Sequence, residues 1–569
     1  MHAFAALLDR LVLTPQRSVK LRLLTDYFRV VPDPDRGYAL AALTGGLRIP
    51  SVKPAMLRAM AAARMDEVLF AYSYDYVGDL AETISLVWAP KAGSPAAPGP
   101  GGEPSRGAVP QGELPIGEGE GTEPPSGDPG AALRLATVVE RLRAASRAEG
   151  PRLVEAWLDQ LDASGRYALI KLVAGGLRIG VSARLAKHAL ALLGGREVNE
   201  IEEVWPGLEP PYGSLFAWLE GRGGPPASGI VAPFRPVMLS HALSDGELAL
   251  IRPEDYAAEW KWDGIRVQAV RETGVARLYT RTGDDISRTF PDLVAALDFE
   301  GAVDGELLVG FEEGGGIVPR SFSDLQQRLN RKAVSARLME SHPAVMRAYD
   351  CLVDGTEDIR ALPFRARRAR LEALVAGSRS RRLDLSPLVP FADGAALRAL
   401  RAAPPAPVIE GLMLKRWDSG YEPGRPKGPW FKWKRDPHTV DAVLMYAQRG
   451  HGKRSSYYSD YTFGVWQEGE AGDELVPVGK AYFGFTDEEL AAIDRFVRNN
   501  TVNRFGPVRE VVHEPGEGLV LEVAFEGLQR SARHRSGIAM RFPRIARLRW
   551  DKPPAEADRL ETLAALLRD

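Results

Sequence analysis

One lysine near the middle of the chain has neighbours that suit covalent chemistry, in the segment Lys261-Trp-Asp-Gly-Ile-Arg266. The surrounding residues, EWKWDGIRVQ, favour a β-strand. A lysine amine that is uncharged near neutral pH can act as a covalent nucleophile. The adjacent Gly264 would let a ligand come close to the backbone. Taken alone the pattern is short, and a single lysine on a strand is more often a solvated surface residue.

Two more lysines occur in a second strand-like segment, Trp430-Phe-Lys-Trp-Lys434. Lys432 and Lys434 are two residues apart, so they point to the same face of a strand. If this strand lies beside Lys261, the two cations would lower the pKa of the Lys261 amine and favour its uncharged form. The alternative is a basic, aromatic strand that binds nucleic acid without catalysis.

Two glutamates next to glycine are candidate metal ligands. Glu306 ends the motif Asp304-Gly-Glu306, and Glu410 begins the segment Glu410-Gly-Leu-Met-Leu-Lys415. We expect both at strand ends, where carboxylates together with substrate phosphates would bind Mg²⁺, with Mn²⁺ as the alternative. Each motif alone is better explained by turn chemistry, and it is their joint position after the lysine motif that favours a metal site.

The short motifs follow one another in a fixed order, namely Lys261–Arg266, Asp304–Glu306, Tyr349-Asp350, Glu410–Lys415, Lys432–Lys434 and Arg549–Lys552. This ordered set resembles the nucleotidyltransferase motifs of the ATP-dependent DNA ligase family, and the resemblance extends over nearly the whole chain. It implies a bacterial enzyme that uses ATP to seal nicks in double-stranded DNA. The intermediates would be AMP bound to Lys261 and then a DNA-adenylate, and we expect the process to be DNA repair.

The resemblance also assigns roles to residues around the nucleotide. Glu259, on the same strand face as Lys261, is similar to the residue that accepts a hydrogen bond from the adenine amino group. Tyr349 stands where relatives commonly have a phenylalanine that stacks on adenine. Glu306 is implied at the ribose hydroxyls as well as at the metal. The remaining implied nucleotide contacts are Arg266, Arg281, Lys415, Lys432 and Lys434, and the alternative for the two arginines is a surface ion pair.

The C-terminal segment RFPRIARLRWDK is dense in arginine, which is typical of a surface that binds phosphates. By resemblance, Arg549 and Lys552 contact the triphosphate of ATP, orient pyrophosphate as the leaving group and then move away so that DNA can enter. This implies a hinge, which we expect between Arg435 and Asp441.

Differences in residue pattern along the sequence divide the chain into three expected domains. Residues 1–220 are predicted to form an all-α DNA-binding domain with two similar halves, because YALAALTGGLRI near Tyr38 is repeated as YALIKLVAGGLRI near Tyr167. Each Gly-Gly pair is expected to end a helix. Arg48 and Arg178 would then lie near the start of the next helix, where they could contact DNA phosphate, or the segments could be simple helix–helix turns.

The other two domains have mixed and β-rich patterns. Residues 231–438 predict an α+β adenylation domain, and residues 439–569 predict an all-β domain of the OB type. A basic glycine-rich loop within the latter supplies Lys453 and Arg454 as candidate DNA contacts. The Pro/Gly/Glu-rich insert at about residues 90–130 is expected to be disordered, and the simplest interpretation is a passive linker.

Composition excludes several classes of protein. The 569 residues carry a net charge of -2 and one cysteine, Cys351, so a disulfide framework and a cysteine-rich zinc site are excluded. The absent four-cysteine site also argues against the NAD-dependent ligases. No apolar run is long enough to span a membrane, and the N-terminus does not resemble a signal peptide. We therefore expect a cytoplasmic protein that binds no membrane. The resemblance implies nicked double-stranded DNA as the partner, and we expect a monomer.

Two other functions remain open from the sequence. An RNA ligase or capping enzyme would share the lysine motif, although such relatives generally lack the doubled helical domain. A non-catalytic DNA-binding scaffold could keep the fold, although the intact lysine motifs argue against decay. Covalent labelling with ATP and comparison of DNA and RNA nicks would separate the three.

Overall fold

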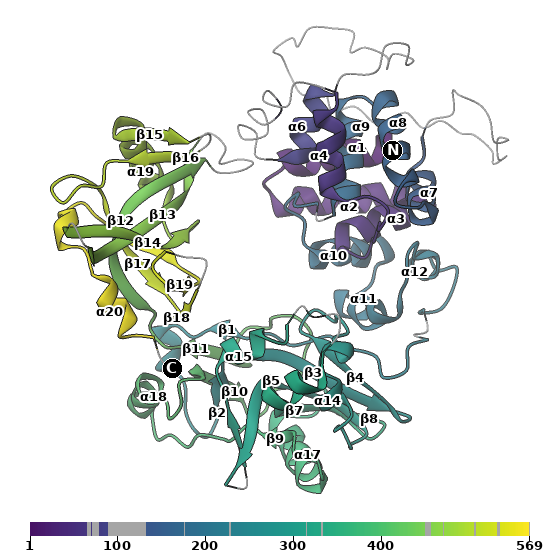
Figure 1. Cartoon of the computed structure of the whole chain (residues 1–569). Helices are drawn as coiled ribbons and strands as arrows, with labels where there is room; N and C mark the ends of the chain where they lie inside the picture. The colour runs from purple at the N-terminus through teal and green to yellow at the C-terminus, as the bar shows by residue number, and fades with distance from the viewer. Residues whose placement is uncertain are drawn as a thin grey trace. The chain divides into compact units, whose positions relative to one another are not determined.

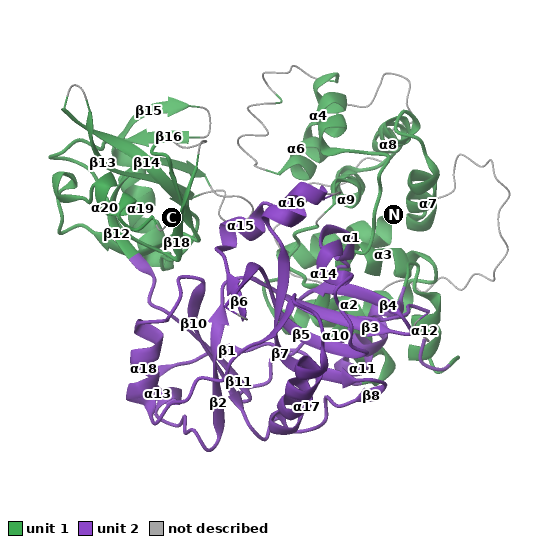
Figure 2. Ribbon diagram, turned by 60° about the horizontal axis from the view of Figure 1, so that its bottom comes forward, with its two compact units in different colours: residues 1–196, 209–223, 439–569 green, residues 197–208, 224–438 purple. Residues whose placement is uncertain are grey.

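The computed structural model describes the chain except for residues 65–69, 71–78, 89–132, 176, 227–228, 315, 330, 332–333, 450–456, 470–471, 506–507, 532–534 and 568–569. The predicted insert at about residues 90–130 and the predicted DNA contacts Lys453 and Arg454 lie outside the described residues. Contacts group the chain into two compact units (Figure 2). Unit 1 comprises Met1–Arg196, Glu209–Gly223 and Thr439–Asp569, and unit 2 comprises Glu197–Leu208 and Gly224–His438.

The N-terminal part of unit 1 is helical, as its apolar periodicity predicts (Figure 1). Its helices are α1 (His2–Leu13), α2 (Arg17–Val30), α3 (Asp35–Thr44), α4 (Pro54–Ala62), α6 (Leu80–Val87), α7 (Leu135–Ala144), α8 (Glu149–Gln160), α9 (Ala163–Ala174), α10 (Ala183–Gly194) and α12 (Gly213–Leu219). Helix α9 contacts α1, α4, α6 and α8, and α10 contacts α2, α3 and α12. Each of these helices buries apolar side chains. Within the described ranges of the chain, no helix combines the length and the apolar character that a membrane span requires.

The two repeated Gly-Gly segments end helices α3 and α9, as predicted. Gly45 caps α3 with φ 77° and Gly175 caps α9 with φ 74°, a backbone region that favours glycine. Arg48 and Arg178 are exposed in the connecting loops shortly before the next helices, which begin at Pro54 and Ala183, and Arg178 lines a groove at the start of α10. A turn at Pro50 and Ser51 precedes α4, and Arg178 and Gly180 have positive φ values of 47° and 70° before α10.

Unit 2 is built on two sheets. One has the order β4-β3-β5-β7-β8, with β6 paired to β5 and β9 paired to β7, and the other has the order β1-β11-β10-β2. The strands are β1 (His241–Ala242), β2 (Tyr256–Trp262), β3 (Ile265–Glu272), β4 (Val275–Thr280), β5 (Gly301–Glu313), β6 (Gly316–Pro319), β7 (Ala344–Asp354), β8 (Glu357–Asp358), β9 (Leu383–Leu385), β10 (Ile409–Arg416) and β11 (Trp430–Lys434).

The helices of unit 2 include α11 (Val198–Val204), α13 (Asp245–Leu248), α14 (Pro291–Val294), α15 (Phe322–Gln326), α16 (Ala336–Ser341), α17 (Phe364–Gly377) and α18 (Gly394–Ala402). Helix α17 packs on β7 and β9 and brings Arg367 and Arg368 into the interior. Helix α11 is joined to this unit by Arg360, whose guanidinium contacts both carboxylate oxygens of Glu203 at 2.6 and 3.0 Å. Unit 2 is therefore the α+β region expected from the mixed sequence pattern.

The C-terminal part of unit 1 is rich in strands, as expected. Its elements are β12 (His438–Arg449), β13 (Tyr458–Gly469), β14 (Gly472–Ala481), α19 (Asp487–Asn499), β15 (Thr501–Phe505), β16 (Val508–Val511), β17 (Val520–Phe525), β18 (Gly527–Arg530), β19 (Ile538–Arg541), β20 (Arg544–Arg549) and α20 (Leu560–Ala564). The main sheet has the order β14-β13-β12-β16-β15, and β17 pairs with β12 and β20. Alternating residues such as Tyr461, Phe463 and Val465 fill its core.

Candidate active site

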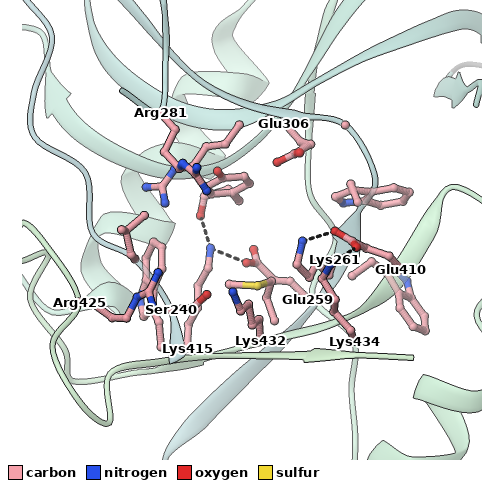
Figure 3. Close-up of a pocket in the computed structure, with 18 residues that line it drawn as sticks. Ser240, Glu259, Lys261, Arg281, Glu306, Glu410, Lys415, Arg425, Lys432 and Lys434 are labelled. Atoms are coloured by element: carbon pink, nitrogen blue, oxygen red, sulfur yellow. Dashed lines mark hydrogen bonds and ion pairs between the residues drawn. The ribbon is translucent and has the colours of Figure 1, made fainter. Parts of the chain in front are cut away.

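A cavity of about 320 Å³ in unit 2 collects the predicted nucleotide residues (Figure 3). Strands β2, β10 and β11 supply one side, and β3, β5 and β7 supply residues from the other sheet. The predicted residues that line it are Glu259, Lys261, Arg266, Arg281, Glu306, Tyr349, Glu410, Lys415, Lys432 and Lys434. Residues as far apart along the chain as Glu259 and Lys434 thus converge on one site.

Strand register aligns the catalytic candidates. Gly411 of β10 lies opposite Lys261 of β2 on one side and Lys434 of β11 on the other. Met413 lies in the same way between Glu259 and Lys432. Because side chains alternate along a strand, the four charged residues share one face of the sheet and point into the cavity.

Glu410 reaches this face because β10 is irregular there. The register between β10 and β2 shifts between Ile409 and Gly411, and such a bulge redirects a side chain that would otherwise point to the opposite face. The Glu410 carboxylate pairs with the Lys261 amine through one oxygen and with the Lys434 amine at 3.1 Å through the other (Figure 3). Burial opposes ionisation of this carboxyl, but the two lysines outweigh that effect and lower the pKa of Glu410.

Glu306 has a contrasting environment. It lies within β5 rather than at a strand end as predicted, and its carboxylate makes no ion pair or side-chain hydrogen bond with the other described residues. Burial, and secondarily the nearby Glu410, raise the pKa of Glu306 to about 8, although Lys261 and Arg266 act in the opposite direction. A carboxylate that is costly to ionise without a partner suits a site that gains a cation or a hydrogen-bond donor when occupied.

The lysine cluster also carries an electrostatic cost. Burial, with added repulsion from Arg425, Lys261 and Lys434, lowers the pKa of Lys432. The predicted free amine on Lys261 stays a prediction, because in the structure this amine is paired with Glu410. An incoming phosphate would relieve the repulsion among these cations by supplying negative charge.

Arg266 is fixed by its buried surroundings. Its guanidinium donates to the Asp304 carboxylate at 2.6 Å, to the Tyr421 hydroxyl at 2.9 Å and to the Met238 carbonyl at 2.6 Å. Arg266 thus forms an ion pair with Asp304, but the pair is largely buried and not the surface pair of the alternative, and its contact with the nucleotide stays a prediction. Its Nε and the Nε1 of Trp430 are buried donors that have no hydrogen-bond partner among the described residues.

Sequence reasoning missed several lining residues, notably Ser240, Met413, Arg425 and Trp430. Alternation along β10 could have found Met413, because it lies two residues from Gly411 and two from Lys415. Ser240 and Arg425 lie in loops, where no periodicity predicts direction. Gly264 lines the cavity, so the expected approach of a ligand to its backbone stays a prediction, and an added Cβ would also lie 2.4 Å from the Leu307 carbonyl oxygen of β5. This glycine permits close packing of the chain against β5.

The remaining predicted residues lie in unit 1. Arg549 and Lys552 both pair with Asp441, at 2.9 and 2.8 Å. Arg178 lies beside Arg17 and Lys20 in a groove at the start of α10, and Arg48 is exposed in the loop after α3. The single cysteine, Cys351, is buried and has a free thiol.

Comparison with known proteins follows the same division of the chain. Residues 237–434 match the family model described as ATP dependent DNA ligase domain, and residues 454–552 match ATP dependent DNA ligase C terminal region. A relative from Koribacter versatilis, named "Probable DNA ligase", is 34% identical over 441 residues and is aligned over 73% of this chain and 74% of its own length. The chain belongs to the ATP-dependent DNA ligase family.

Other comparisons agree with this ligase assignment. The DNA ligase of Thermococcus onnurineus is 32% identical over 426 residues, covering 73% of each chain. A solved structure titled "Pmar-Lig_PreS3" aligns with 96% of the ligase and 99% of its own chain at a TM-score of 0.57 and 14% identity, which shows a shared fold. The sequence resemblance is thus confirmed, and the chain is a DNA ligase that uses ATP.

Two carboxylates in the cavity are compatible with magnesium. Among the described residues no group of three or more His, Cys, Asp and Glu side chains is arranged to hold a metal ion. Mg²⁺ commonly needs only one or two carboxylates when substrate phosphates and water complete its shell. The chemistry of Glu306 and Glu410 therefore fits a metal ion that binds together with the nucleotide.

Proposed function

We propose that this ligase seals single-strand nicks in duplex DNA through an AMP–lysine intermediate on Lys261. The Lys261 nitrogen attacks the α-phosphorus of ATP, and pyrophosphate leaves. The AMP then passes to the 5′-phosphate of the nick, and the 3′-hydroxyl attacks that phosphate and releases AMP. The observation that carries this proposal is the alignment of Lys261 with Lys434 across Gly411, beside Glu410, inside a cavity.

Charge placement gives each side chain a role in the first step. Lys432 and Lys434 would bind the α-phosphate and stabilise its developing charge. Glu410 would release Lys261 when phosphate attracts the neighbouring ammonium groups. Glu306 and Glu410 would hold Mg²⁺, which neutralises charge on phosphate oxygens when bound.

The other end of the cavity suits a purine nucleoside. Tyr349 and Met413 would contact the two faces of the base, since both line the cavity and come from different sheets. Glu259 would accept a hydrogen bond from the 6-amino group, beside Lys415. Arg266 and Arg281 would contact ribose or phosphate, with Glu306 near the ribose hydroxyls.

DNA contacts are proposed for the flanking regions. We propose domains at residues 1–220, 231–438 and 439–569, the first acting as a DNA-binding domain and the last as an OB-type domain. The groove of Arg17, Lys20 and Arg178 at the start of α10 supports phosphate binding in the helical region. Arg48 would contribute from the equivalent loop, and Arg549 and Lys552 would exchange Asp441 for the triphosphate.

Labelling with ATP carrying a radioactive α-phosphate tests the proposal. The parent protein should become covalently labelled with ATP and not with NAD, and Lys261→Ala should show no label. Lys480→Ala, which removes an exposed lysine of β14, is the matched control and should label normally. Persistent labelling of Lys261→Ala, or none in the parent, would defeat the assignment.

Sealing assays with DNA nicks and RNA-containing nicks test which nucleic acid the ligase joins. A DNA nick should be sealed faster than a nick with RNA on either side, and the opposite order would favour an RNA-joining enzyme. We propose DNA repair as the cellular process, which predicts that deletion of the gene sensitises cells to agents that break DNA strands. Normal survival of the deletion strain would contradict a repair role.

A further inference from the structure

A buried charge cluster stands behind one wall of the nucleotide cavity. It consists of Glu259 on β2, Lys415 on β10 and Arg368 on α17, which are 1%, 1% and 4% exposed. Lys415 Nζ lies 2.5 Å from one oxygen of Glu259, and Arg368 Nη1 lies 2.9 Å from the other. Glu259 and Lys415 line the cavity, whereas Arg368 touches it only through Glu259.

Arg368 is held in place by several acceptors. Besides Glu259, Nη1 donates to the Ser386 carbonyl at 2.9 Å, and Nε donates to the Glu372 carboxylate at 2.7 Å. These acceptors lie on different parts of the chain, so the guanidinium plane has little freedom. The arginine therefore fixes which way the Glu259 carboxylate faces.

The two cations of the cluster are not equivalent. Lys415 also donates to the Tyr349 carbonyl at 3.0 Å and lies over the rings of Tyr349, Phe364 and Trp430, and burial lowers its pKa. A lysine in such a site can give its proton to a carboxylate, whereas arginine stays charged in proteins. Burial raises the pKa of Glu259, and Lys415 and Arg368 both oppose that rise.

We propose that Arg368 is a positioning residue that determines base specificity by keeping Glu259 ionised and oriented for the 6-amino group of adenine. The inference rests on the proposed function, in which Glu259 reads that group. An ionised carboxylate only accepts hydrogen bonds, so it accepts from a 6-amino group and repels the oxygen of a 6-oxo purine. A protonated carboxyl can donate to that oxygen, and the selection would be lost.

The role of Arg368 in base specificity is tested by comparing covalent labelling of the protein by ATP and by inosine triphosphate, which carries a 6-oxo group. Arg368→Met keeps an apolar stem and removes the charge. We expect KM for ATP to rise roughly tenfold with kcat changed less than about threefold, and the ATP-to-inosine-triphosphate ratio of kcat/KM to fall roughly tenfold, as for loss of one charged hydrogen bond. Arg368→Lys should restore part of the ratio, because it restores the charge.

Control variants separate the possible failures. Arg370→Met removes an exposed arginine of the same helix, paired with Asp354 at 2.8 Å, and should leave the ratio unchanged. If Glu259→Gln shifts the ratio and a folded Arg368→Met does not, the inference is wrong while the adenine role of Glu259 stands. If Glu259→Gln also leaves the ratio unchanged, the adenine role itself is wrong. Should Arg368→Met not fold, Arg368→Gln removes the charge with a polar side chain, and a folded Arg368→Gln protein with a parental ratio would overturn the inference.

Discussion

Replacement of Glu306 by glutamine should stabilise the ligand-free ligase while removing its activity. The pKa of Glu306 is raised from its ordinary 4.5 to about 8, chiefly by burial. At about 1.36 kcal/mol per pKa unit, this difference corresponds to roughly 5 kcal/mol against the ionised form. The side chain is partly exposed to the cavity, so we expect about 2 to 4 kcal/mol of added stability at pH 8.

The sign of the pH dependence follows from proton binding. Between pH 4.5 and about 8 the folded protein keeps the Glu306 proton that the unfolded chain has lost, so this group makes stability fall as pH rises through that window. Below pH 4.5 both states are protonated, and the contribution of ionisation disappears. Glu306→Gln lacks this titration and should show a flatter decline.

Urea unfolding at pH 5.5, 7 and 8 measures this pH dependence. The urea midpoint of the parent should fall as pH rises, and the midpoint of Glu306→Gln should fall less. Glu313→Gln, which alters an exposed glutamate of the same strand, is the matched control. Parallel pH profiles of the parent and Glu306→Gln would refute the buried-charge argument. Magnesium should stabilise the parent at pH 8 more than the variant, and equal stabilisation would remove Glu306 from the metal site.

Three further predictions concern packing and charge. Gly411→Ala would put a Cβ 2.2 Å from the Trp433 carbonyl oxygen, so both melting temperature and lysyl-adenylation should fall, whereas Gly246→Ala in open space should change neither. Lys432→Met should lower the labelling rate by about 100-fold with little change in melting temperature, because it removes charge aimed at phosphate; a parental rate would refute this. Phe463→Ala should lower the free energy of unfolding by about 3 to 5 kcal/mol, measured with urea, because the ring is fully buried. A smaller loss than that caused by Phe542→Ala, which removes an exposed ring, would contradict the assigned core.

Much of the candidate site could be predicted because it depends on short-range rules. Alternation along a strand placed Lys432 with Lys434 and Glu259 with Lys261, and the structure has both pairs on the cavity face. The glycine pairs that end α3 and α9 were predictable for the same reason, since left-handed backbone favours glycine. The helical, mixed and β-rich regions likewise follow from apolar periodicity.

Other features depended on contacts between distant segments. The bulge that turns Glu410 toward Lys261, the packing of β5 against Gly264 and the position of Arg368 behind Glu259 all join residues far apart along the chain. No local pattern specifies which strands pair or in which register, because register is set by the burial of whole sheets. The sequence by itself thus determined which chemical groups this ligase has and which of them share a face of a regular strand. Only the tertiary structure decided which of them touch, since ion pairing and desolvation depend on distances that folding alone establishes.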